Sequence, residues 1–209
     1  MTPEIVRLLP EGSDEDGRGF MEMYLRECIY LNTDNRDIRY LLPKPYEYAD
    51  ITDKKNNPLN VLPTAKYVLK SHLEIIEALD KKLSSEGIDI FDLHSIIKID
   101  DNNMMCPPIL EVWEQEPYNG IPVIVDGQHR LYIARKRQRM INCVVISGKI
   151  SSDLPVLPLA GWHEVIECDT VPKDKRNFHP GVPKPWKPHE VYRVQFPGSA
   201  GPRTVTSTK

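Results

Sequence analysis

The chain has 209 residues, of which 40% are apolar and 27% charged, and its formal net charge is −3 at pH 7. This length is enough to bury one sizeable core, so we expect one domain with appendages. The net charge argues against a surface that is basic all over, but it is compatible with a local basic patch that binds nucleic acid. No run approaches eighteen apolar residues and the N-terminus lacks a signal-peptide pattern, which predicts a cytoplasmic protein with no membrane partner.

Residues 1–58 are predicted to form an N-terminal extension or cap. They begin with an acidic segment at 11–19 and continue with one short helix at 20–31, whose apolar residues fall roughly on one face. Residues 44–58 are rich in proline, asparagine and charged residues, and we expect turns there.

The apolar pattern becomes regular from Leu59, where residues 59–62 predict a short strand. A helix over 71–83 is predicted next, with Ser71 as N-cap and Glu74 completing a capping box. Gly87 is suited to the left-handed residue that ends such a helix. The apolar stripe of this helix consists of Leu73, Ile76, Leu79 and Leu83.

The next segment, 88–99, fits either a helix or a strand. Residues 107–115 predict a strand, and the turn residues 116–120 join it to an apolar strand at 121–127 as a hairpin. A helix over 128–139 follows, with Leu131, Ala134 and Gln138 facing inward, and 141–147 predict the last strand. This order of elements indicates an α+β fold.

Residues 151–209 form a proline-rich tail that we expect to be partly extended. From Thr170 onward the tail carries eight Lys or Arg and two Asp or Glu. A basic tail that keeps the protein soluble and a surface for nucleic acid or an acidic partner both fit this composition.

Cysteines and histidines do not predict a metal site. The four cysteines are widely spaced, without the close pair of a zinc ribbon or redox motif, so we expect reduced, buried thiols. His72 and His94 have no ligand-like partner three or four residues away and are predicted to be surface or packed side chains. His163, with Glu164 and Asp169, follows the last predicted strand and fits either the lining of a binding cleft or, as we favour, a loop edge.

The segment DGQHR, Asp126 to Arg130, is the most informative part of the sequence. A strand that ends in Asp-Gly and runs directly into a helix brings unpaired backbone N–H groups and the positive end of the helix dipole together. Gly127 lets the backbone take a positive φ and lets an anion approach closely. Arg130 adds a charged fork and His129 a titratable donor. Asp126 is a helix cap, a magnesium ligand or a catalytic base.

These residues carry a resemblance to the ParB/sulfiredoxin superfamily. The similar segments are PPILEVW, IPVIVDGQHRLYIARKRQ and INCVVI, supported by NVLPTAKYV and the helix after it, from about Leu59 to Ile146. The resemblance implies a compact mixed sheet with packed helices in a core at 59–150. It also implies that the turn binds nucleotide phosphates through Gly127, His129 and Arg130, to which we add Gln128.

Members of the superfamily imply different activities. Sulfiredoxins carry a reactive cysteine where this chain has Gln128, so sulfinic-acid repair is not expected. ParB partition proteins continue into a helix-turn-helix domain, which has no counterpart in this proline-rich tail. Free-serine kinases have a similar turn and use a carboxylate in the loop after the first strand. That loop, 63–66, has none here, so Asp126, Glu47 or Asp50 would replace it.

The first hypothesis is a phosphotransferase that uses ATP or ADP with Mg²⁺ and acts on a small hydroxyl compound such as a free amino acid. Asp126 would be its catalytic carboxylate and its Mg²⁺ ligand, and Lys66 and Tyr67 are additional candidates for contacts with the nucleotide. The second hypothesis is a regulatory module with slow or no turnover, associated with DNA or, like proteins named for a DGQHR motif, with a DNA-modification system. The basic run Arg135, Lys136, Arg137 and Arg139 is interpreted as a solvent-exposed helix end, with DNA contact not favoured.

Overall fold

The computed structural model describes residue 46 and residues 48–94, 97–100, 103–150, 156–170, 172 and 177–178. The predicted helix at 20–31, Glu47 and the end of the tail lie outside the described residues. The strands are β1 (Tyr48–Asn56), β2 (Tyr67–Leu69), β3 (Ile97–Asp100), β4 (Asn103–Met105), β5 (Ile109–Trp113), β6 (Ile121–Asp126), β7 (Ile141–Lys149), β8 (Val156–Leu157), β9 (Ile166–Cys168) and β10 (Asn177–Phe178). The helices are α2 (Lys70–Ser84), α3 (Gln128–Lys136) and the 3₁₀ turns η2 (Pro58–Asn60) and η3 (Trp162–Glu164).

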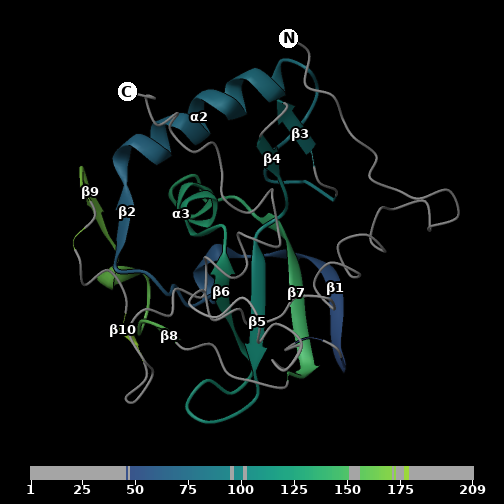
Figure 1. The fold of residues 1–209 in the computed structure, drawn as a ribbon, viewed down its shortest axis with the longest axis vertical. Helices are drawn as coiled ribbons and strands as arrows, with labels where there is room; N and C mark the ends of the chain where they lie inside the picture. The colour runs from purple at the N-terminus through teal and green to yellow at the C-terminus, as the bar shows by residue number, and fades with distance from the viewer. Residues whose placement is uncertain are drawn as a thin grey trace, which may run out of the picture.

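Four strands form the central sheet in the order β1-β7-β5-β6 (Figure 1). β5 runs parallel to β7, while the β1–β7 and β5–β6 pairs are antiparallel. The predicted hairpin is confirmed, because β5 and β6 pair from Ile109 opposite Asp126 to Trp113 opposite Ile121. The mixed sheet and its packed helices confirm the α+β fold class.

The turns predicted over 44–58 are wrong for most of that segment. Tyr48–Asn56 is a nine-residue strand that pairs along its whole length with β7. The charged residues hid it, because an edge strand tolerates charged side chains while its backbone still pairs with a neighbour. Residues 48–56 therefore share one sheet with the predicted core segment, although the sequence placed them in the extension.

The strand predicted at 59–62 is also wrong. Proline at position 58 opens a 3₁₀ turn, and the side chain of Asn57 accepts a hydrogen bond from the N–H of Leu59 (3.0 Å). Only Leu62 pairs with the sheet, through a single parallel bridge to Val123. In the segment 88–99, which fitted either a helix or a strand, residues 88–94 form neither, and strand β3 (Ile97–Asp100) begins at Ile97.

The helix predicted at 71–83 is confirmed, but its predicted capping box is wrong. α2 begins at Lys70, one residue before Ser71, and its N-cap Leu69 makes no side-chain capping bond. The chain enters the helix directly from β2, which leaves no position for a capping serine. At the other end Gly87 has a φ of +79°, and the N–H of Ile88 donates to the carbonyl of Leu83 (2.9 Å), as predicted for a left-handed stop.

The core lies between the two helices and one face of the sheet. Leu73, Leu79 and Leu83 of α2 are buried there with Leu131 and Ala134 of α3, as predicted. The inward position predicted for Gln138 is wrong, because α3 ends at Lys136 and Gln138 is exposed with a φ of +52°. None of the described helices is long and apolar enough to cross a membrane.

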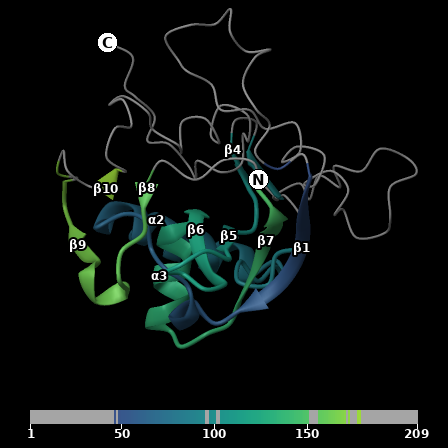
Figure 2. The ribbon, with the colours of Figure 1, turned by 90° about the horizontal axis from the view of Figure 1, so that it is seen from below.

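Two short strand pairs lie on the side of the molecule away from β1. β9 pairs in parallel with β2, and β10 pairs with β8 (Figures 1 and 2). β9 thus brings the start of the predicted tail region back to the segment that leads into α2.

Candidate functional site

Gly127 connects β6 to α3 in the left-handed conformation, with a φ of +84°. A Cβ at this position would lie 2.7 Å from the Cβ and 2.9 Å from the Cα of Pro108, so only glycine fits. Gly127 is the N-cap of α3 and has no side chain with which to cap it. The first intrahelical hydrogen bonds of α3 run from the N–H groups of Arg130 and Leu131 to the carbonyl of Gly127. The N–H groups of Gln128 and His129 therefore lie before these bonds, at the N-terminal end of the helix.

Gln128 holds the loop 63–66 against α3. Its Oε1 accepts hydrogen bonds from the N–H groups of Thr64 (3.1 Å) and Ala65 (2.9 Å), and its Nε2 donates to the carbonyl of Ala65 (2.6 Å). The side chain is buried. Gln128 thus uses its amide to position a loop, a role that the sequence alone did not indicate.

His129 joins the beginnings of the two helices. Its Nε2 accepts a hydrogen bond from the N–H of Leu69, the residue before α2 (3.1 Å). A protonated imidazole has no acceptor nitrogen, so His129 makes this bond as the neutral ring with its hydrogen on Nδ1. Its ring also lies 5.1 Å from that of His72 in α2.

Arg130 is buried and donates a hydrogen bond from Nη1 to the carbonyl of Cys106. Burial raises the pKa of the Cys106 thiol to about 12. The charge of Arg130 lowers this pKa by a smaller amount, and the charge of Asp126 raises it. Both charged side chains are therefore close to Cys106, one on each side of the glycine turn. A thiol with this pKa is inert near neutral pH.

The first turns of α2 (Lys70–Leu73) and α3 (Gln128–Leu131) form what we call the two-helix corner. Neither turn contains an acidic residue, and neither helix has a side-chain cap. The two turns carry four basic residues, Lys70, His72, His129 and Arg130. Lys70 and Arg130 carry a charge, whereas His129 is neutral in its bond with Leu69. Cations near a helix N-terminus cost about 0.3–1 kcal/mol each, so the placement of these two charged residues opposes the usual preference.

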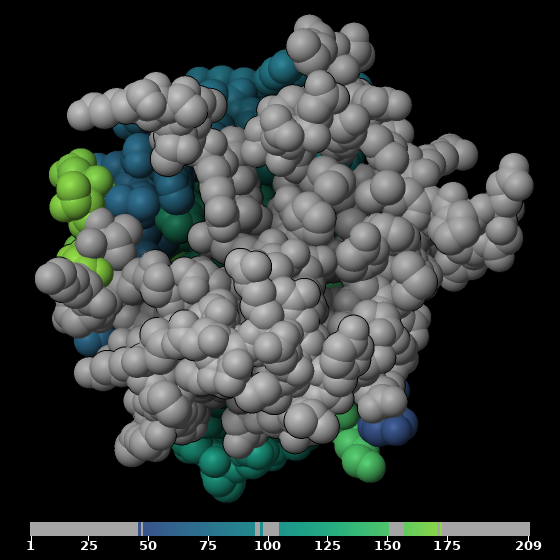
Figure 3. All heavy atoms as spheres, viewed as in Figure 1, coloured from purple at the N-terminus to yellow at the C-terminus, as the bar shows by residue number. Residues whose placement is uncertain are grey.

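Of the additional candidates, Lys66 is the last residue of the loop that Gln128 holds, and Tyr67 follows it. The carbonyl of Lys66 accepts a hydrogen bond from the N–H of Ile166 in β9 (2.8 Å), and Tyr67 begins β2. Asp169, assigned to a loop edge from the sequence, forms an ion pair with Lys70 (3.1 Å). In the space-filling view β9 lies beside β2 and the start of α2 on the left side of the molecule (Figure 3).

The basic run after α3 is largely neutralised within the protein. Lys136 pairs with Glu167 (2.9 Å), Arg137 with Asp80 (2.5 Å) and Arg139 with Asp89 (2.5 Å). The guanidinium carbon Cζ of Arg135 lies 5.9 Å from the ring centroid of Trp162 in a cation–π contact. These contacts support the interpretation as a helix end and leave little free charge for a DNA backbone.

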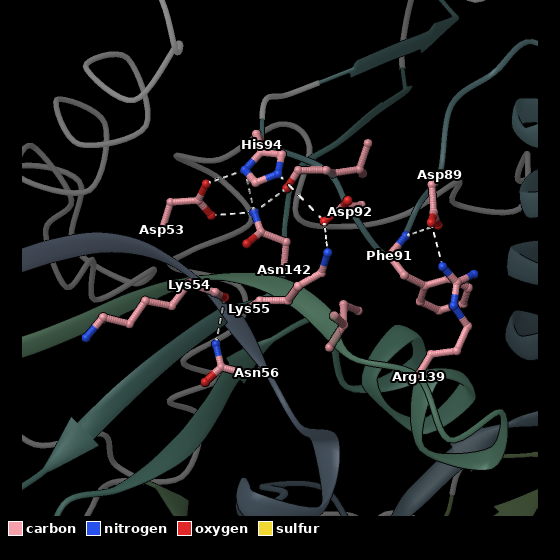
Figure 4. Close-up of polar contacts among 12 residues, drawn as sticks. Asp53, Lys54, Lys55, Asn56, Asp89, Phe91, Asp92, His94, Arg139 and Asn142 are labelled. Carbon is pink, nitrogen blue, oxygen red and sulfur yellow. Dashed lines mark hydrogen bonds and ion pairs between the residues drawn. The ribbon is translucent and has the colours of Figure 1, made fainter.

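A second polar cluster lies at the edge of the sheet, around His94 (Figure 4). Asp53 accepts a hydrogen bond from Asn142 and contacts Nδ1 of His94 (2.6 Å), while Asn142 also donates to the carbonyl of Leu93 (2.7 Å). Asp92 pairs with Lys55 (2.8 Å). The cluster fixes the segment after α2 to β1 and β7, and His94 lies in it with a largely exposed side chain, in line with the surface or packed position predicted for it.

Metal-binding residues do not gather in the described part of the chain. Among the described residues no three His, Cys, Asp or Glu side chains are placed to hold an ion. A single carboxylate such as Asp126 can contribute to binding Mg²⁺ when the phosphates of a substrate supply the other ligands of the ion. Cys106 and Cys143 are buried free thiols, as predicted, while Cys168 is partly exposed.

Comparison with known proteins identifies the family of the chain. The model of the ParB CE domain matches residues 36–167, more than half of the chain, and includes the whole DGQHR turn and the central sheet. Neither curated proteins nor solved structures give a significant match. The match confirms a ParB-like protein, while the relation to sulfiredoxins and free-serine kinases stays a prediction. The chain belongs to the ParB CE domain family.

Proposed function

We propose that this protein binds a nucleotide through its phosphates at the two-helix corner and transfers a phosphoryl group from it to a small hydroxyl compound. The observation that carries the proposal is that two helix N-termini are linked by the Leu69–His129 hydrogen bond, with the charged residues Lys70 and Arg130 and no acidic residue in their first turns. Two positive helix ends that meet at one point favour a multiply charged anion such as a triphosphate.

The site residues divide into those that contact phosphate and those that hold the site together. The backbone N–H groups of Gln128 and His129 donate to phosphate oxygens, as at other helix N-termini. Arg130 uses one donor on Cys106 and retains further guanidinium donors for a phosphate oxygen. The side chains of Gln128 and His129 keep the loop 63–66 and the start of α2 in position around these donors.

Asp126 supplies the carboxylate for the transfer step. The acceptor hydroxyl attacks the terminal phosphorus, the bond from that phosphorus to the bridging oxygen breaks, and the nucleoside diphosphate leaves when ATP is the donor. Asp126 accepts the hydroxyl proton. When Mg²⁺ is bound to the phosphates it neutralises charge, and the same carboxylate is the residue that would contact it. The contribution of the protein is then mainly positioning and charge stabilisation.

Two measurements test the proposal in order. The melting temperature of the full chain is compared with ATP, ADP, CTP and GTP, with and without Mg²⁺, because a ligand that binds only the folded protein raises it by mass action. The nucleotide that binds is then incubated with serine and other small hydroxyl compounds, and phosphorus NMR follows any new phosphate ester. Binding with ester formation supports both parts, binding without it reduces the protein to a nucleotide-binding module, and no binding rejects the proposal.

A further inference from the structure

Strand β1 forms one edge of the central sheet. In the order β1-β7-β5-β6 it pairs with β7, and no other described strand pairs with it. Figures 1 and 2 show β1 at the outer side of the sheet, beyond β7. In an antiparallel pair only every second residue bonds to the neighbouring strand, so about half of the backbone N–H and C=O groups of β1 point away from β7. Such an edge can accept another strand.

The edge of β1 has few of the features that protect a strand from pairing. Protected edges are short, contain proline or a bulge, or carry charged side chains that repel a second strand. β1 is nine residues long and contains no proline, and its register with β7 runs without a shift from Tyr48 to Asn56. Its charges are therefore the remaining protection, and their signs decide which strand the edge can accept.

The two faces of β1 differ in what their charged residues contact. On one face, Asp53 and Lys55 are joined to the polar cluster around His94, and Figure 4 shows Lys54 pointing away from that cluster. On the opposite face, neither Asp50 nor Lys54 forms an ion pair with another described residue. The side chains exposed on this face are those of Tyr48, Asp50, Thr52 and Lys54. One negative and one positive charge thus lie at equal distances in sequence from Thr52.

We propose that two copies of this chain associate through β1, by antiparallel pairing of the two edges around a twofold axis at Thr52. This inference does not depend on the proposed function. The backbone groups of the two edges supply the hydrogen bonds, and two Asp50–Lys54 pairs between the copies fix the register. The facing residues are Tyr48 with Asn56, Ala49 with Lys55, Asp50 with Lys54, Ile51 with Asp53, and Thr52 with Thr52 of the second copy.

The charge pattern selects this register over its neighbours. Facing residues of an antiparallel pair point to the same side of the sheet, so a twofold axis through a continuous sheet makes one residue face itself. Like charges, which are unfavourable when they face each other, would do so with the axis at Asp50, Asp53, Lys54 or Lys55. An axis at Ile51 avoids this, but it places Asp50 opposite Thr52 and forms no pair of opposite charges. The axis at Thr52 pairs all nine residues and both charges of the exposed face.

Sedimentation equilibrium of the full chain over a range of protein concentrations tests the proposal. The wild type is expected to show a monomer–dimer equilibrium. Asp50→Lys and Lys54→Asp each place like charges opposite one another at two positions, and each should weaken the dimer about tenfold. The double variant exchanges the two charges and restores the opposite pairs, so it should dimerise within about threefold of the wild type. Circular dichroism verifies that each variant is folded.

Two further variants separate the register from a general effect of charge. Glu86→Lys changes the net charge as much as Asp50→Lys does, at an exposed position in the turn after α2, and should leave the dissociation constant unchanged. Thr52→Lys makes two lysines face each other when the axis is at Thr52 and should weaken the dimer. With the axis at Ile51 the same lysine would face Asp50 and strengthen it.

Each outcome supports or overturns the inference. A wild-type chain that stays monomeric at every concentration overturns it. Association that Asp50→Lys and Lys54→Asp leave unchanged also overturns it, because another surface would then join the copies. A double variant as weak as the single variants contradicts the charge pairing, and a stronger dimer of Thr52→Lys contradicts the register. None of these results bears on nucleotide binding, so the proposed function stands or fails separately.

Discussion

Leu69 and His129 are sixty residues apart in the chain, yet the backbone N–H of Leu69 donates directly to Nε2 of the His129 ring (3.1 Å). This single bond brings the beginning of α2 to the beginning of α3. With the contacts of Gln128 and Arg130, three consecutive side chains of one turn each hold a different segment of the protein. The DGQHR turn is thus a structural junction as well as the proposed phosphate site.

Gly127→Ala is expected to lower the free energy of unfolding by about 2–4 kcal/mol. The left-handed φ of +84° costs an alanine about 1–2 kcal/mol, and the contact of its Cβ with Pro108 adds overpacking. Gly87→Ala is the matched control, because Gly87 has a similar φ of +79° but a Cβ there would have no atom within 4 Å. Urea denaturation measures both variants, and equal losses would contradict a specific contact with Pro108.

Gln128→Ala is expected to cost about 3 kcal/mol, because three hydrogen bonds to Thr64 and Ala65 are lost at about 1 kcal/mol each. Thr64→Val removes only the bond from the Thr64 hydroxyl to the carbonyl of Ile124 and should cost about 1 kcal/mol. Urea denaturation compares the two. A loss in Gln128→Ala no larger than that in Thr64→Val would show that the loop does not depend on this side chain.

Cys106 is expected to resist alkylation in the folded protein. With a pKa of about 12, only about one thiol in ten thousand is a thiolate at pH 8, and the side chain is fully buried. Partly exposed Cys168 should react with iodoacetamide before Cys106 does, which peptide mass spectrometry measures. Modification of Cys106 before Cys168 under native conditions would contradict the burial of this thiol behind Arg130.

Acid is expected to weaken the attachment of β9 to α3. Hydrogen bonds from Lys136 and then Tyr132 lower the pKa of the Glu167 carboxyl below its ordinary value of 4.5. A lowered folded-state pKa contributes stability that is present above pH 4.5 and is lost as the pH falls through the folded-state value. Glu167→Gln should therefore be less stable than the wild type at pH 7, and the difference should shrink at pH 3.

Urea denaturation at the two pH values measures this difference. A gap between wild type and Glu167→Gln that stays constant from pH 7 to pH 3 would show that the Glu167 charge does not stabilise the fold.

Elements with a clear apolar period were predictable from the sequence. The stripe of α2, the β5–β6 hairpin and the strand–glycine–helix turn are all in the structure, because their burial pattern is local. Strand β1 was not predictable, since its alternating pattern is weak and β7, which pairs with it, lies about ninety residues further along the chain. The same long-range pairing hid β2, whose partner β9 follows the core.

The candidate site was predictable only in part. Gly127 and the position of the turn followed from residue types, while the roles of the Gln128 and His129 side chains depend on loops that fold against them. Lys70 was not recognised as the first residue of α2, because the expected capping serine placed the helix start one residue too late. A useful sequence signal was present there, since a lysine and a histidine within a first helical turn oppose the dipole.

The most direct test of the central claim is a nitrogen-15 NMR titration of the full chain with Mg²⁺-ATP and, in parallel, with adenosine. Phosphate binding at the two-helix corner predicts that the backbone amide signals of Gly127, Gln128 and His129 shift with ATP at concentrations where adenosine leaves them unchanged. Saturable ATP binding that leaves these three amides in place, or equal shifts with adenosine, would contradict a phosphate site at the beginning of α3.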